Sequence, residues 1–505
     1  MKTETKNLIL FYIESFLISL LSAYFIWLQT SKYGIGMEPH YPLIAKSFLD
    51  KGFEHILYTK DVLYAPLYPF SLACFSRIFN SEILNTARWL NIVLAFIFSF
   101  LSMTLCRKLT KNLATLFFFG LFIIFSKPIN FLFSLTQCEP LFMFIILVLI
   151  FAIEKTTYKR LILCGFLTSL AILTRYAGVA IVPSVCLYIF IQKSKMPEKI
   201  KKCFCYAIIP TSTYIIYIIR NYYFTETLMG PRTSSQTGLL SNIDRAVFSV
   251  SSWFSGSYFF LVLAFCLIFG AFLWNYRLEL IKFVEENVGG EFKFSFCFLL
   301  VYSAFIIVSV TTTALDPLDD RFMSPVFLPM LLILFSLLNF AISLKNKNKF
   351  LISGLFCLLV IASLLSFYKT TKEINFRKRE GAGYCSRVFW QEHELLNDIK
   401  NNAIIGNNEY IFTNNFCITA VLNKHPNINY IPQKRERGSS RDSSGVNLNN
   451  LLSKYPHFEN GYIFWAFKEY DDIFFSIYEL QSVCEIKKIV ETKDGILYKV
   501  GKCKQ

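Results

Sequence analysis

Long apolar stretches recur along the first three quarters of this chain and limit what it can fold into. They measure roughly 15–22 residues each and continue to about Tyr368, so each is long enough, or nearly so, to cross a membrane as a helix. The chain has 505 residues, 54% hydrophobic and 17% aromatic. A soluble protein of this length does not need so much apolar surface, so most of the chain must face lipid.

We predict about eleven membrane helices, with the N-terminus in the cytoplasm and the C-terminus outside. The first apolar stretch follows Lys2 and Lys6 and lacks a small-residue cleavage site, so it is predicted to be a retained helix rather than a signal peptide. The predicted spans cover residues 8–29, 86–106, 112–126, 134–153, 161–174, 178–192, 203–219, 257–275, 294–312, 325–344 and 350–368.

The net charge of +16 would suggest nucleic acid in a soluble protein, but here the basic residues stand in short breaks between the apolar stretches. The positive-inside rule places such breaks in the cytoplasm, and the alternating breaks contain fewer lysines and belong outside. The charge therefore sets orientation and does not indicate a nucleic-acid partner. The basic breaks are residues 107–111, 155–160, 193–202, 277–293 and 345–349.

Hydropathy falls after residue 368, and the pattern changes to alternating helix and strand. We predict a small α/β domain outside the membrane over residues 369–505. Expected elements are an amphipathic segment at 386–401, strands at 409–413 and 461–467, an extended segment at 429–432, helices at 415–423 and 446–455, and a hairpin at 484–500. Four of the 14 cysteines lie here and could form one or two disulfides: Cys385, Cys417, Cys484 and Cys503. The fold class is thus an α-helical polytopic membrane protein, residues 1–368, followed by an exocytoplasmic α/β domain.

The outer segment from residue 29 to about 85 carries the strongest candidate for chemistry. Glu38 stands just outside the membrane, in front of residues 41–49, whose apolar spacing suits a helix lying in the interface. A carboxylate there can act as a general base toward an acceptor hydroxyl, which contributes roughly 10²–10⁴ in rate. The alternative is a solvated loop glutamate.

Further polar residues are predicted to lie at the outer membrane face, where each needs a partner or water. Cations there would stabilise a phosphate leaving group, and Arg175 is the foremost because it interrupts an apolar run. Its alternative role is snorkelling to the interface, and Arg321 could be held by Asp319 or Asp320 as a structural ion pair. Glu139 could bind sugar hydroxyls or cap a helix. The substrate-binding candidates are His40, Tyr41, Lys60, Tyr64, Glu139, Arg175, Arg220 and Arg321.

Several short motifs resemble those of GT-C fold integral-membrane glycosyltransferases, which include the protein O-mannosyltransferases and the lipid A aminoarabinose transferases. Met37-Glu-Pro-His-Tyr-Pro-Leu-Ile-Ala-Lys46 resembles the Asp-Glu-Pro-Arg-Tyr motif of their first outer loop. Similar motifs follow in the same order over roughly residues 1–370: Ala65–Phe70, Ala87–Asn91, Glu139–Phe142, Thr174–Gly178 and Asp320–Pro325. One departure is Met37, which stands where such enzymes usually carry the first of two acidic residues.

The resemblance implies transfer of a sugar, with inversion, from a polyprenyl-phosphate donor to a lipid, glycan or protein acceptor at the outer face, with Glu38 as base. No cofactor is assigned, although an Asp/Glu site could hold a divalent cation. A bacterial inner membrane is the expected location. Two alternatives remain: a lipid-linked sugar flippase or other transporter, and a catalytically inactive relative that acts as a scaffold, for which Met37 is the main argument.

Overall fold

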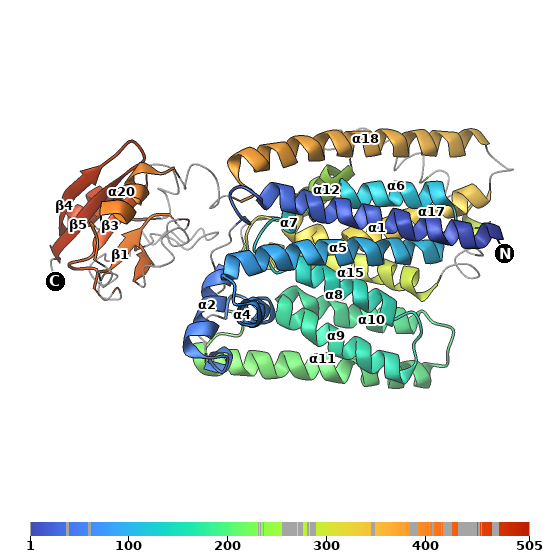
Figure 1. The fold of residues 1–505 in the computed structure, drawn as a ribbon. Coiled ribbons are helices and arrows are strands. Elements are labelled where there is room, and N and C mark those ends of the chain that lie inside the picture. The colour runs from blue at the N-terminus through green and yellow to red at the C-terminus, as the bar shows by residue number, and fades with distance from the viewer. Residues whose placement is uncertain are drawn as a thin grey trace.

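A computed structural model shows a long helical bundle with a small sheet beyond one of its ends (Figure 1). It describes the chain except for residues 1, 37–39, 59–61, 231, 233, 236, 255–269, 271–275, 280–281, 283–288, 345–348, 384–391, 403, 407–408, 416, 418–426, 433–451, 453–454, 456, 467–473 and 504–505.

Helices build the bundle, and the long apolar ones among them mostly follow the order of the predicted spans. They are α1 (Lys2–Thr30), α5 (Ile83–Leu109), α6 (Leu113–Ile124), α7 (Lys127–Leu132), α8 (Glu139–Ala152), α9 (Tyr158–Thr174), η1 (Tyr176–Ala180), α10 (Ile181–Phe190), α11 (Met196–Thr225), α12 (Leu239–Phe254), α15 (Gly290–Thr312), α16 (Asp320–Met323), η2 (Ser324–Val326), α17 (Phe327–Ser343) and α18 (Lys349–Glu380). One large core of buried aliphatic and aromatic side chains runs through the bundle.

Six stretches of the described helices are long and apolar enough to cross a membrane, judged by length and composition: Thr5–Thr30, Ile83–Leu109, Leu113–Leu132, Met196–Thr225, Gly290–Thr312 and Asp320–Ile342. Glu139–Ala152 and Tyr176–Phe190 are apolar but shorter. The predicted span 257–275 lies almost wholly outside the described residues, so the count of eleven stays a prediction.

Three of the predicted basic breaks meet at one end of the bundle. Lys108 forms ion pairs with Glu154 at 3.0 Å and with Glu291 at 2.9 Å, and Arg160 lies 3.6 Å from Glu154. The N-terminus lies at this end in Figure 1. The alternation of basic and lysine-poor breaks in the sequence therefore corresponds to two opposite ends of the bundle.

Short helices lie at the other end, on the side of the sheet: α2 (His40–Lys51), α3 (His55–Tyr58) and α4 (Leu67–Phe79) (Figure 1). The helical spacing of residues 41–49 correctly predicted α2. Its buried face, which includes Ile44 and Phe48, packs with Tyr68 and Leu72 of α4 in a separate small core.

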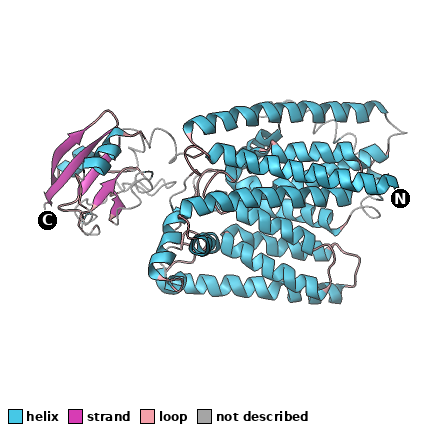
Figure 2. Cartoon of the chain, viewed as in Figure 1, coloured by secondary structure: helices cyan, strands magenta, loops and turns pink. Residues whose placement is uncertain are grey.

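A five-stranded sheet with the order β2-β1-β3-β5-β4 forms the C-terminal part of the chain (Figure 2). The strands are β1 (Ile411–Thr413), β2 (Ile428–Tyr430), β3 (Tyr462–Ala466), β4 (Cys484–Glu491) and β5 (Gly495–Cys503). β1 pairs in parallel with β2 and β3, whereas β5 pairs antiparallel with β3 and β4.

Helices cover both faces of this sheet, because successive strand residues point to opposite sides. Phe464 of β3 packs with α20 (Glu394–Asn402), and its neighbour Ile463 packs with Leu480 of α23 (Ile477–Gln481). The predicted strands and hairpin are confirmed, while most of the predicted helices at 415–423 and 446–455 lie outside the described residues. The domain boundary at residue 368 stays a prediction, and α18 continues beyond it to Glu380.

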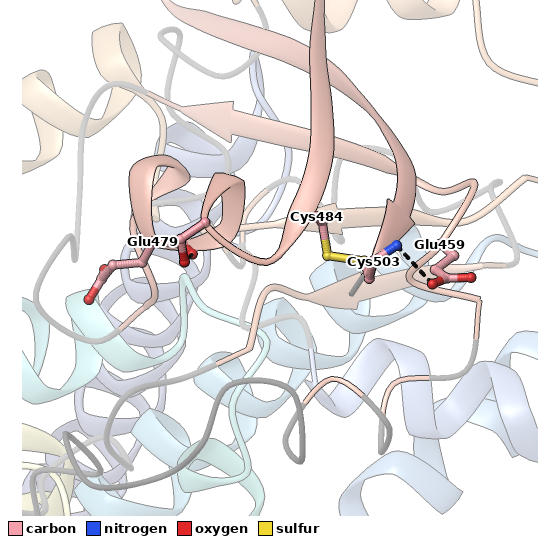
Figure 3. Close-up of a disulfide and its surroundings, with 5 residues drawn as sticks. Glu459, Glu479, Cys484 and Cys503 are labelled. Atoms are coloured by element: carbon pink, nitrogen blue, oxygen red, sulfur yellow. Dashed lines mark hydrogen bonds between the residues drawn. A yellow bond between two sulfur atoms is a disulfide. The ribbon is translucent and has the colours of Figure 1, made fainter. Parts of the chain in front are cut away.

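The strands β4 and β5 are joined at their open end by a disulfide between Cys484 and Cys503 (Figure 3). Next to it, the Cys503 backbone N–H donates to the Glu459 carboxylate at 2.9 Å. Cys417 is also disulfide-bonded. The prediction of disulfides in this region is thus confirmed.

Candidate functional site

The segment before Glu139 is held by Gly36, which directly precedes the first predicted motif, and by Asn91, which ends the motif Ala87–Asn91. Gly36 donates its backbone N–H to the Ser134 carbonyl at 2.8 Å, and Thr136 N–H donates to the Gly36 carbonyl at 2.7 Å. From the other side, the buried Asn91 amide donates to the carbonyls of Phe133 and Leu135. A Cβ on Gly36 would lie 2.8 Å from the backbone nitrogen of Gly383, which cannot move aside as a side chain can, so only glycine fits here. The chain just before Glu38 is thereby fixed beside the start of α8.

Glu139 and Arg175 form a buried ion pair at this end of the bundle. Glu139 opens α8, where a negative charge interacts favourably with the helix dipole. Arg175 follows α9 in an extended conformation, and its Nη1 lies 3.3 Å from Glu139 Oε1. The same nitrogen donates to the Arg321 carbonyl at 2.9 Å. The two side chains are only 6% and 13% exposed, so Arg175 does not simply snorkel to the surface.

The position of Arg175 depends on a tight contact of the next turn. Gly178 packs directly on the backbone of α9, because a Cβ there would lie 2.6 Å from Ala171 C and Ile172 N. The chain can therefore fold back into η1 immediately after Arg175. This gives a local reason for the order of residues in Thr174-Arg-Tyr-Ala-Gly178.

Arg321 lies above Phe322 together with Arg175, and acidic residues hold it. Its Nη2 lies 2.8 Å from Asp316, and its Nε lies 3.6 Å from Asp319. The predicted ion pair with Asp319 is present. Burial raises the pKa of the Asp319 carboxyl, while the charge of Arg321 acts in the opposite direction. The Arg175 and Arg321 guanidinium carbons lie 5.2 and 5.5 Å from the Phe322 ring centroid, so two cations share one ring.

Asp320 turns away from Arg321 and enters a network that sequence reasoning missed. Its carboxylate accepts hydrogen bonds from Trp253 Nε1 at 2.8 Å and Ser249 Oγ at 2.9 Å, and it forms an ion pair with Lys127. The available signal was Lys127 itself, a lysine in a break otherwise expected outside the membrane.

Aromatic residues of the first outer segment line the same end of the bundle. His40 stacks on Tyr64 with ring centroids 4.8 Å apart, and Tyr41 contacts Tyr64 edge-on at 5.1 Å. The Tyr41 hydroxyl donates to Cys138 Sγ at 3.1 Å, next to Glu139. Burial raises the pKa of Tyr41 well above its ordinary value, so this phenol stays protonated and remains a donor. These residues could present aromatic faces to a sugar or acceptor.

Of the remaining predicted site residues, Arg220 lies apart from the Arg175 cluster, and two others are not described. Arg220 donates to the Ile56 carbonyl at 3.1 Å and to the Asn221 amide oxygen at 3.0 Å. It is connected to the Arg175 region only through neighbours, since Asn221 donates to the hydroxyl of Tyr176 at 3.2 Å. Glu38 and Lys60 lie outside the described residues. Within the described ranges, His, Cys, Asp and Glu side chains form no group of three or more that could hold a metal ion.

No protein-family model matches this chain, and no curated protein matches it by sequence. Its fold, however, resembles that of solved structures. ArnT from Cupriavidus metallidurans bound to undecaprenyl phosphate superposes with a TM-score of 0.58 at 10% identity, covering 97% of both chains. Its apo form gives 0.59 over 98% of both chains.

The archaeal oligosaccharyltransferase AglB from Archaeoglobus fulgidus, in complex with an inhibitory peptide and a dolichol-phosphate, has a TM-score of 0.54 at 11% identity. That match covers 90% of this chain and 69% of AglB. Sequence identities of 10–11% show a similar fold and nothing more specific. The likeness to ArnT extends over nearly the whole length of both proteins. The resemblance of the motifs over roughly residues 1–370 predicted this architecture correctly: the chain has the GT-C fold.

Proposed function

We propose that this protein transfers a sugar, with inversion, from a polyprenyl-phosphate donor to an acceptor at the end of the bundle that carries Glu139, Arg175 and Arg321. The single observation that supports this most is that Arg175, paired with the buried Glu139, and Arg321 share the ring of Phe322 beside the first outer segment. The fold likeness agrees with it, because ArnT and AglB were solved with undecaprenyl phosphate and a dolichol-phosphate respectively.

In the proposed step, Glu38 takes the proton of an acceptor hydroxyl as the acceptor oxygen attacks the anomeric carbon. The bond from that carbon to the phosphate oxygen breaks, and polyprenyl phosphate leaves with the electron pair. Arg175 and Arg321 would stabilise the charge that develops on the phosphate, because a guanidinium has five N–H donors and each uses only some of them on its carboxylate partners.

The described residues on either side of Glu38 in the sequence support its assignment as base. Gly36 is anchored to Ser134 and Thr136, and His40 opens α2 in stacking contact with Tyr64. In the sequence, Glu38 stands midway between these two described residues. The segment that contacts Gly36 leads directly into Glu139.

We further propose that the sheet lies outside the cytoplasm of a bacterial cell, with the basic end of the bundle in the cytoplasm. Disulfides persist in oxidising compartments, and Cys484–Cys503 lies in the sheet. Lys108 and Arg160 lie at the opposite end, as the positive-inside rule requires for cytoplasmic loops.

The purified full-length protein, incubated with polyprenyl-phosphate sugars and an acceptor lysate, tests the proposal. We expect turnover by the wild type and a loss of about 10²-fold or more in Glu38→Gln, because the amide cannot accept the proton. Glu54→Gln, in the same outer segment, serves as the matched control and should retain activity. Transport of the lipid-linked sugar without turnover would instead support a flippase, and neither activity would support a scaffold.

A further inference from the structure

A cavity of about 400 Å³ lies next to the candidate site. Residues of α7, α12, α16 and α18 line it, and so does Asp319. Asp319 and Asp320 precede Arg321 directly, so one short turn separates this cavity from the Arg175 cluster. The cavity contains none of the substrate-binding residues assigned above, and the proposed transfer does not use it.

Apolar side chains form much of its wall. Its apolar lining residues are Phe125, Phe131, Trp253 and Leu365. Phe125 makes an edge-on ring contact with Phe367 of α18 at 4.9 Å. Phe367 is 48% exposed, and its neighbour Tyr368 is 68% exposed. The apolar wall is thus continuous with the outward, apolar surface of α18, which in a membrane protein faces lipid.

The cavity is lined by three cations and three carboxylates, and Lys369 is the cation that forms no ion pair with a described residue. Lys127 is paired with Asp320, Arg377 lies 2.8 Å from Glu373, and Asp319 is engaged by Arg321. Lys369 has no carboxylate at ion-pair distance among the described residues. Its Nζ donates to the Ser252 carbonyl at 3.4 Å, and an ammonium group has two further N–H donors.

We propose that this cavity binds the phosphate-bearing head group of an anionic lipid, with Lys369 as the direct contact. Phosphate oxygens would accept hydrogen bonds from the Lys369 ammonium, and the first carbons of the lipid would lie against Phe125 and Leu365. A free phosphate offers the same charge but would leave this wall without a partner. The site does not depend on the proposed transfer reaction, and its test requires no turnover.

Calorimetric titration of the full-length protein in neutral detergent tests this, with dihexanoyl phosphatidic acid, dihexanoyl phosphatidylcholine and inorganic phosphate as probes. We expect saturable binding of phosphatidic acid that weakens about tenfold in Lys369→Ala, the loss typical of one hydrogen bond to a charged group. Lys369→Arg should retain the affinity. Lys372→Ala removes an exposed lysine of the same helix outside the cavity and should change nothing.

A second variant tests whether Leu365 and Lys369 contribute to one binding site. Leu365→Glu places a negative charge in the cavity and should abolish the Lys369-dependent binding. Equal affinity for phosphatidylcholine would overturn the anionic preference, and inorganic phosphate binding as tightly as phosphatidic acid would overturn the lipid assignment. Unchanged affinity in Lys369→Ala, with the protein still folded by its thermal transition, would place the lipid elsewhere.

Discussion

At the scale of single residues, the Glu139–Arg175 pair couples stability to the proposed chemistry. Both side chains are almost fully buried, so removing one partner leaves a charge without compensation in a medium that solvates it poorly. We expect Arg175→Met to lower the stability of the folded bundle by about 3–5 kcal/mol, measured by unfolding in detergent.

A double variant separates the two roles of this pair. In Glu139→Gln/Arg175→Met both charges are gone, so most of the lost stability should return, while transfer activity should remain absent because the phosphate has lost a cation. Arg107→Met, at the basic end of the bundle, is the comparison for a cation far from the proposed site and should retain activity. Recovery of activity together with stability in the double variant would show that the pair is only structural.

At the scale of elements, the fold-back from α9 to η1 sets the position of Arg175. Gly178→Ala inserts a methyl group against the α9 backbone, and such overpacking costs about 1–3 kcal/mol. We expect lower stability and, because Arg175 shifts with the turn, a loss of transfer activity larger than the stability change explains. Gly354→Ala is the matched control, since a Cβ at this exposed helical glycine of α18 meets nothing within 4 Å. Equal behaviour of the two variants would contradict this account.

Elements were predictable from the sequence where a local pattern determined them. Apolar length indicated the long helices, helical spacing indicated α2, and the turn around Asp494 indicated the β4–β5 hairpin. Arg175 stood out because it interrupts an apolar run. Partners distant in the sequence were not predictable: the Lys127–Asp320 pair joins residues that only the packing of α7 against α16 brings together. No local sequence pattern around either residue indicates that they pair.

At the scale of the whole molecule, the sheet should respond to pH through one buried histidine. His393 has no exposed surface, and burial lowers the pKa of its imidazole, with Asp494 acting in the opposite direction. The folded state therefore favours the neutral ring, and unfolding lets it bind a proton at its ordinary pKa of about 6.5. The free energy of unfolding is therefore not reduced by His393 above about pH 6.5. It decreases as the pH falls below this value, because the unfolded state then binds a proton that the folded state disfavours.

Thermal unfolding of the protein between pH 5 and 8 measures this effect, with proteolysis of the sheet as the readout of unfolding. We expect the transition to fall toward acid pH in the wild type and to fall less steeply in His393→Leu. The exposed His457, replaced by Gln, serves as the control and should keep the wild-type slope. A slope in His393→Leu equal to that of the wild type would assign the acid sensitivity to other groups.

The proposed orientation of the whole molecule rests on two features that lie at opposite ends. Basic residues of two breaks, Lys108 and Arg160, meet around Glu154, and the disulfide-bonded sheet lies beyond the other end of the bundle (Figure 1). Alkaline phosphatase, which is active only outside the cytoplasm, should therefore be inactive when fused after Thr156 or Lys195 and active when fused after Gly381 in a bacterial host. Activity of the Thr156 fusion would show the opposite topology. Arg175 and Arg321 would then lie in the cytoplasm, where transfer to an outer acceptor cannot occur.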